Sequence, residues 1–145
     1  MKTGTIRQTV QLPGTPDEVY TALMTTKGHG GFTGAPARIS GRVGGTFTAW
    51  GDYIHGKNLE LVPGKRILQL WRPTDDTWPP DHYSKVRFVL TSVRGGTRLR
   101  FTHSLVPLEH IGHLSAGWKQ SYWNPLTRYL RAQAETAAAS SKGRR

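Results

Sequence analysis

The middle of this chain is a succession of short strand-like segments separated by tight turns, and this pattern limits the fold more than any other feature. The candidate strands are residues 37–40, 46–50, 53–61, 66–72, 83–92 and 97–103. The segments between them carry residues typical of hairpin turns, namely Gly44-Gly45, Gly51-Asp52, Pro63-Gly64 and Gly95-Gly96. Consecutive strands on short turns favour an antiparallel meander over parallel β–α–β units.

One strand and one helix precede the meander, and a long helix follows it. Alternating apolar and polar residues over 6–12 predict the strand. Thr15-Pro16-Asp17-Glu18 is a capping box that begins a helix ending near Thr26. The glycine-rich residues 29–34 fit neither period and predict an irregular link. The final helix is expected from about Ser115 to Ala134, with a kink or a break at Pro125.

These elements predict one α+β domain over residues 1–135, followed by a basic, disordered tail over 136–145. We expect a curved antiparallel sheet of six to seven strands wrapped around the long C-terminal helix, with one or two short helices after the first strand. A helix of about 20 residues is about 30 Å long. Because such a helix cannot fill the concave side of the sheet, we expect a pocket between the two.

The composition indicates a soluble, cytoplasmic domain. The mean hydropathy is −0.50, no apolar run approaches the ~20 residues that cross a bilayer, and Met1–Thr5 lack the apolar stretch of a secretory signal. The absence of cysteine excludes disulfides and thiolate metal sites. The net charge of +11 raises the question of nucleic acid, but the basic residues are scattered and no nucleic-acid-binding motif is present, so this partner is not favoured.

A series of short motifs, in this order and at these spacings, resembles one known family. The motifs are Phe32-Thr33-Gly34-Ala35-Pro36-Ala37, Val43-Gly44-Gly45-Thr46-Phe47, Gly56 with Leu59-Glu60-Leu61, Pro63 and Arg66-Ile67, Trp71-Arg72, Gly95-Gly96-Thr97 with Leu99, Thr102-His103, and Gly117-Trp118. The sequence is similar, over about Ile6 to Leu130, to homologues of the C-terminal domain of the activator of heat-shock protein 90 ATPase. That family is a branch of the START-like (SRPBCC, helix-grip) superfamily.

The resemblance implies a helix-grip fold with a deep cavity, as in lipid carriers, plant hormone-binding allergens and aromatic polyketide cyclases. It supplies no catalytic motif that could be placed residue by residue. The eukaryotic co-chaperone has a separate N-terminal domain that contacts the chaperone, and no counterpart is expected here. The resemblance therefore does not carry chaperone activation across to this chain.

Histidine is the residue type here with most scope for chemistry. Leu99, Phe101 and His103 share one face of a strand, so His103 is expected to point toward the cavity. It is either a core histidine bonded to a backbone carbonyl or a polar contact and general base. His110 and His113 are three residues apart, but no Glu completes a zinc motif, so we expect an exposed helix surface. No metal and no cofactor are predicted.

Aromatic residues are the main candidates for a pocket lining, because Trp and Tyr combine an apolar body with one polar group. The predicted ligand-binding residues are Phe32, Trp50, Tyr53, His55, Trp71, Phe88, Phe101, His103, Trp118 and Tyr122. If Trp71 faces inward, Gln69 does too and needs a partner; the opposite face of that strand is equally apolar. Trp78, in the acidic loop 75–81, is a candidate lid over the cavity mouth.

Three functions follow from these features. The first is binding of a small apolar or aromatic molecule in a cavity between the sheet and the C-terminal helix, with a stress-related role left open. The second is a cavity enzyme of polyketide-cyclase or hydrolase type, in which His103 and Tyr53 direct a reactive ligand. The third is a protein-interaction or co-chaperone-like module. A homodimer also stays open, and the ligand itself is not identified by the sequence.

Overall fold

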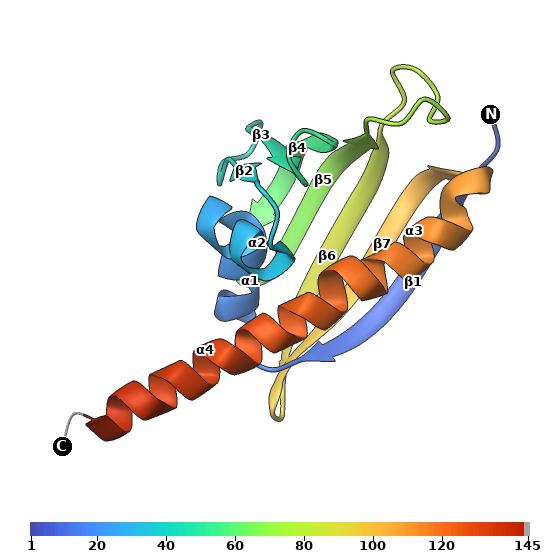
Figure 1. Cartoon of the computed structure of the whole chain (residues 1–145). Coiled ribbons are helices and arrows are strands. Elements are labelled where there is room, and N and C mark those ends of the chain that lie inside the picture. Colours follow the sequence, from blue (N-terminus) through green and yellow to red (C-terminus); the bar gives the residue numbers. More distant parts are fainter. Residues whose placement is uncertain (144–145) are drawn as a thin grey trace.

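Seven strands form one antiparallel sheet in the order β1-β7-β6-β5-β4-β3-β2, and the helices lie on one of its faces (Figure 1). The computed structural model describes residues 1–143. The strands are β1 (Thr3–Leu12), β2 (Arg38–Ile39), β3 (Thr46–Ala49), β4 (Ile54–Val62), β5 (Arg66–Pro73), β6 (Ser84–Val93) and β7 (Gly96–Pro107). The predicted meander, with the N-terminal strand as the seventh member, is confirmed, and the sheet and long helix together form a helix-grip fold.

The helices fall into an N-terminal pair and one long C-terminal rod. They are α1 (Pro16–Met24), α2 (Thr26–Thr33), a 3₁₀ turn (Leu108–His110), α3 (Ile111–Trp118), a π-helical turn (Lys119–Trp123) and α4 (Asn124–Gly143). In Figure 1 the rod formed by α3, the π turn and α4 lies across the sheet from the end of β7. No helix in the described part of the chain is both long and apolar enough to cross a membrane.

The start of α1 is as predicted, but the prediction of an irregular link after this helix is wrong. Glu18 N–H donates to Thr15 Oγ1 at 3.2 Å and Thr15 N–H donates to Glu18 Oε1 at 2.9 Å, which completes the capping box. The glycine-rich segment instead forms α2. Thr25 Oγ1 accepts from Gly28 N–H at 3.0 Å to cap its first turn, and Gly34 at φ 72° ends it in the left-handed region.

The C-terminal helix also differs from the prediction at three places. It begins at Ile111, four residues earlier than expected, and a π turn directly before Pro125 replaces the predicted kink or break. Because proline has no N–H to donate, this widened turn absorbs the missing bond. The helix then continues to Gly143, beyond the predicted end at Ala134, in an alanine-rich segment that favours helix. The disorder predicted for the basic tail over 136–145 stays a prediction. Residues 144–145 lie outside the described part.

Aromatic rings fill most of the space between the sheet and the helix rod. Phe101 on β7 lies against Trp118 with ring centroids 4.4 Å apart, and Phe88 on β6 lies 5.2 Å from Phe101. The π turn brings Trp118 and Trp123 into a stack at 5.7 Å. The deep gap that the sequence predicted is therefore largely closed by the protein's own side chains, and open space is left toward the β3–β4 end.

The close packing of α1 against α2 generates a prediction about glycine. A Cβ added at Gly28 would lie 2.7 Å from Ala22 Cα, whereas at Gly30 the nearest atom, Ala35 O, is 3.4 Å away. We expect Gly28→Ala to lower the free energy of unfolding by about 1–3 kcal/mol. The matched variant Gly30→Ala, in the same helix, should be neutral or gain up to about 1 kcal/mol. Urea unfolding measures both, and equal effects would contradict this packing.

Candidate functional site, a pocket lined by aromatic rings

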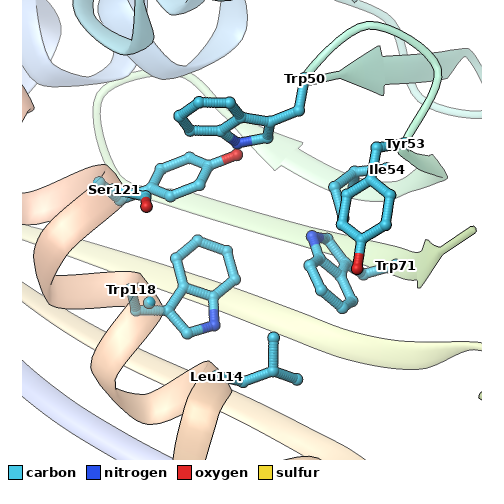
Figure 2. A pocket seen from close by; sticks show the side chains of 9 residues that line it. Trp50, Tyr53, Ile54, Trp71, Leu114, Trp118 and Ser121 are labelled. Atoms are coloured by element: carbon cyan, nitrogen blue, oxygen red, sulfur yellow. The ribbon is translucent and has the colours of Figure 1, made fainter. Parts of the chain in front are cut away.

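A pocket of about 300 Å³, open to solvent, lies between the β3–β4 loop, strands β4 and β5, and the helix rod. Figure 2 shows Trp50 of the loop facing Trp118 of α3 and Trp71 of β5 across this space. The lining residues are Trp50, Tyr53, Ile54, Trp71, Leu114, Gly117, Trp118, Ser121 and Tyr122. None of them carries a charge near neutral pH, so the pocket suits an uncharged, mainly apolar molecule.

The loop between β3 and β4 holds Trp50 in an uncommon backbone conformation. Trp50 has φ 56°, in the left-handed region that bulky residues rarely adopt. The loop is fixed on both sides, because Gly51 N–H donates to Pro36 O at 2.9 Å and Tyr53 N–H donates to Trp50 O at 3.3 Å. Such strain is costly by about 1–3 kcal/mol and is concentrated at ligand clamps and other functional sites.

The Trp50 ring is also tied to the helix rod. It lies edge-on to the Tyr122 ring with centroids 6.4 Å apart, and the Tyr122 hydroxyl lies 3.1 Å from His29 Nε2. Burial raises the pKa of Tyr122 well above its ordinary value, and the neighbouring Trp50 indole offsets this only in part. Tyr122 is therefore a neutral phenol that joins the loop, the π turn and α2 at one edge of the pocket.

A buried hydrogen-bond chain holds the opposite wall. Trp118 Nε1–H donates to His103 Nδ1 at 3.0 Å. Because indole nitrogen only donates, Nδ1 is unprotonated and His103 Nε2–H donates to Ser84 Oγ at 2.8 Å. The Ser84 hydroxyl in turn donates to Trp71 O at 3.0 Å. The chain links α3 to β7, β6 and β5.

His103 positions the pocket but does not enter it. Its side chain is 0% exposed, both ring nitrogens are occupied, and burial lowers its pKa to about 3. A neutral, enclosed imidazole cannot take a proton from a molecule in the pocket. The structure thus differs from both sequence alternatives, since His103 is a core histidine whose partners are a serine hydroxyl and an indole.

Trp71 is an indole of the pocket wall whose N–H is left for a ligand. Among the described residues, Trp78 donates to His82 O, Trp118 to His103 and Trp123 to Gln8 Oε1, whereas Trp71 Nε1 has no hydrogen-bond partner. Only two buried polar side-chain atoms of the described part lack a partner, and Trp71 Nε1 is not one of them. Its nitrogen therefore reaches the open pocket, on the ring side that faces Trp50 and Trp118 in Figure 2.

Half of the predicted ligand-binding residues come together at this pocket. Those that line it are Trp50, Tyr53, Trp71, Trp118 and Tyr122. Those that do not are Phe32, His55, Phe88, Phe101 and His103. The strand parity that predicted Phe88, Phe101 and His103 to face inward is right, but rings from the helix rod cover them.

Phe32 and His55 lie outside the pocket for different reasons. Phe32 is on α2, where it packs behind Tyr122 with ring centroids 5.7 Å apart. His55 alternates with the buried residues Ile54 and Gly56 on β4, so it points to the other face of the sheet and lies against Tyr83 at 6.4 Å. Neither residue contacts the cavity.

The lining residues that the sequence did not indicate are Ile54, Leu114, Gly117 and Ser121. Leu114, Gly117 and Ser121 lie at helical spacing from Trp118 and Tyr122. Residues 114, 117, 118, 121 and 122 therefore share one helix face. Leu114 was missed because the helix was expected to begin only at Ser115, and Gly117 and Ser121 because only aromatic residues were chosen as lining candidates.

Trp78 and His110 also differ from their predicted roles, whereas Gln69 faces inward with Trp71, as the conditional prediction required. Trp78 is 2% exposed and packs against Trp71, so it is part of the core and not a lid. His110 is buried, against the prediction of an exposed surface, and its Nε2 lies 3.2 Å from Thr77 Oγ1. Gln69 does face inward, and its amide donates to Asn58 Oδ1 at 2.9 Å. Its partner is thus a side chain of β4.

The fold and the pocket define a helix-grip domain of the START-like class with an aromatic cavity at one end of the helix rod. The family described as "Activator of Hsp90 ATPase homolog 1-like protein" matches residues 13–131, and the chain belongs to this family. The predicted family is therefore confirmed.

Individual relatives agree with this assignment. The human protein named activator of 90 kDa heat shock protein ATPase homolog 1 is 28% identical over 108 residues, which cover 74% of this chain and 31% of that protein. The chain thus spans about a third of the length of this curated relative.

Two solved structures share the fold. The crystal structure of PFC0360w, an HSP90 activator from Plasmodium falciparum, has a TM-score of 0.70 at 23% identity and covers 86% of this chain and 92% of that one. DynU16, a protein of the dynemicin biosynthetic locus, has a TM-score of 0.72 at 23% identity and covers 88% of this chain and 47% of that one.

The buried histidines generate a prediction about pH. Burial lowers the pKa of His29 to about 4 and that of His103 to about 3, from an ordinary 6.5. Below pH 6.5 the unfolded chain therefore binds protons that the folded protein does not, so stability falls as the pH drops from 6.5 toward 4. Each histidine should lower the free energy of unfolding by on the order of 1.4 kcal/mol for each unit by which the pH falls in this window.

Urea unfolding at a series of pH values measures this slope. His103→Gln should remove the His103 contribution to it, whereas Ser84→Ala, which keeps the imidazole but deletes its partner, should lower stability and retain the slope. A His103→Gln protein with the slope of the unmodified protein would show that His103 is not a buried neutral group.

Proposed function

We propose that this domain binds a small, uncharged, mainly aromatic molecule in the pocket between Trp50, Trp71 and Trp118. The observation that carries the proposal is the free N–H of Trp71 in an uncharged, mainly apolar pocket of about 300 Å³. This volume lies at the lower end of the range for small-molecule sites, about 300–1,000 Å³. A ligand of two or three fused rings fits it.

The polar groups of the pocket narrow the ligand further. Trp71 offers a donor and no acceptor, so a carbonyl, ether or phenol oxygen of the ligand is the matching group. The hydroxyls of Tyr53 and Ser121 line the same space and can serve either role. A charged ligand group would lose its hydration without an opposite charge in the lining, which disfavours organic acids and amines.

The relatives support two readings of this pocket. The DynU16 name places that protein in a biosynthetic locus, which fits handling of a small product. The names of the human relative and of PFC0360w point to activation of a 90 kDa heat-shock ATPase, and this is our second candidate function. Stimulation of a purified chaperone's ATPase by this domain would support it, and the absence of any stimulation or binding would remove it.

An enzyme is the less favoured alternative, because the residue proposed as its base is enclosed. His103 has no route to the ligand, and the lining has no carboxylate or imidazole to replace it. A cyclase that acts only by folding a reactive substrate needs no such base, so that variant of the alternative remains compatible with the pocket. The cytoplasmic location and the homodimer stay predictions.

Filling the pocket from Gly117 tests the proposal. A Cβ at Gly117 meets no atom within 4 Å, and the same is true of Gly112, which is exposed in the same helix. We expect Gly117→Leu to weaken binding of 2-acetylnaphthalene at least about tenfold, because the side chain enters the pocket, with stability unchanged within about 0.5 kcal/mol. Gly112→Leu is the matched control and should bind normally. Isothermal titration calorimetry measures both, and unaltered binding by Gly117→Leu would refute the site.

The role of Trp71 gives a separate prediction. Trp71→Phe keeps a ring in the wall but removes the N–H, so binding of 2-acetylnaphthalene should weaken by about 0.5–1.5 kcal/mol. Binding of 2-isopropylnaphthalene, which has no acceptor, should change far less. An equal loss for both probes would mean that Trp71 contributes packing only.

A further inference from the structure

The face of the sheet opposite the helices gathers basic side chains that the sequence scatters. In Figure 1 this face is turned away from α4, and no described element covers it. Alternation along β1, β4, β5, β6 and β7 sends Arg7, Lys57, Arg72, Lys85, Arg87 and Arg100 outward. All of them are exposed except Arg72, which is half-buried.

Strand register arranges these residues in two groups of three. Thr102 lies directly opposite both Arg7 and Arg87, and Arg100 is two residues before it on β7, so Arg7, Arg87 and Arg100 surround Thr102. Leu70 lies directly opposite both Lys57 and Lys85, and Arg72 is two residues beyond it on β5. Arg100 is the diagonal neighbour of both Arg7 and Arg87, and Arg72 of both Lys57 and Lys85, and such neighbours lie about 7–8 Å apart. The two residues that flank Thr102, and the two that flank Leu70, are about 10 Å apart across the middle strand. No basic residue of either group stands directly opposite another.

Almost nothing on the protein neutralises this face. Glu60 is the only acidic residue within a described strand, and it pairs with Arg66 at 3.0 Å. No other ion pair forms among the side chains that the structure describes. The Nε of Arg72 is buried and has no hydrogen-bond partner there. The two groups therefore present positive charge to the solvent with no ion pair to neutralise it.

We infer that this outer sheet face, defined by the two groups above, binds an extended acidic segment of a partner protein. An extended chain advances about 3.2–3.4 Å per residue, so carboxylates at alternate positions are about 7 Å apart. That repeat matches the diagonal spacing of the basic groups. Complementary charge also speeds encounter and selects acidic partners over basic ones.

Two other polyanions fit the face less well. Single-stranded nucleic acid is held by stacking of bases on aromatic rings, and the only aromatic ring at the outward positions of β1, β4, β5, β6 and β7 is that of His55 on β4, which already packs against Tyr83. An anionic bilayer is flat, whereas this face is the convex side of a sheet that curves around the helix rod (Figure 1). A flexible polypeptide can follow that curvature.

The test uses a fluorescein-labelled peptide of twelve glutamates and fluorescence anisotropy at about 0.15 M salt, where the Debye length is about 8 Å. Arg87→Glu/Arg100→Glu should weaken binding at least about tenfold, because the charges of the face act at close range. The matched control is Arg128→Glu/Arg131→Glu on α4, which changes the net charge equally at exposed sites away from the face. It should weaken binding less than about threefold.

A second pair of substitutions and two other polyanions complete the test. If circular dichroism shows that the charge-reversed protein does not fold, the neutral double variant Arg87→Gln/Arg100→Gln takes its place. Its affinity for the peptide should still be several-fold lower than that of the unmodified protein. Equal losses for the face and control variants would mean that net charge alone attracts the peptide, which overturns the inference. The inference is also overturned if the unmodified protein does not bind the peptide. It is overturned as well if twelve-residue oligothymidylate or phosphatidylserine vesicles bind more tightly than the peptide and the face variants weaken that binding.

Discussion

The indole N–H of Trp118 donates a buried hydrogen bond to His103, and the form of the pocket depends on this contact. Since indole can only donate, it fixes the protonated nitrogen of His103, which passes a hydrogen bond to Ser84 and from there to the Trp71 carbonyl. Trp118 and Trp71, which form two walls of the pocket, are thus the two ends of one series of hydrogen bonds that crosses three strands. Removing any member leaves a buried polar group unpaired, at a cost of about 1–3 kcal/mol. The histidine that looked most like a catalytic residue is therefore the residue that keeps the aromatic walls in place.

The same walls rely on two departures from regular backbone. The π turn at Lys119–Trp123 shifts the helix phase by one residue, so Trp118 and Trp123 stack and Tyr122 still faces the sheet. The left-handed conformation of Trp50 turns its ring over the pocket from the opposite side, where it meets Tyr122. Rings that would otherwise fill a deep cavity are divided between a packed core around Phe101 and an open pocket at one end. The candidate ligand site is this open pocket.

Local patterns were sufficient for the sheet, the capping box and the family, because strand alternation and turn residues act over a few positions. They failed at α2, where glycines suit a helix only because α1 packs within van der Waals distance of Gly28. They could not choose the inward face of β5, since Leu68 and Leu70 are as apolar as Ile67 and Trp71. The basic outer face was likewise invisible: Arg7 and Arg87 are neighbours only through the register of both with Thr102.

Trp71 offers its indole N–H to a ligand, whereas the indoles of Trp78, Trp118 and Trp123 donate within the protein. The five tryptophans give separate indole N–H signals in a ¹H–¹⁵N NMR spectrum, and adding 2-acetylnaphthalene tests the claim directly. We expect a large shift of the Trp71 signal as its N–H meets the carbonyl, while the signals of Trp78 and Trp123, which lie outside the pocket, keep their positions. A spectrum in which the Trp71 signal stays fixed, or in which Trp78 and Trp123 move as far as Trp71, would contradict it.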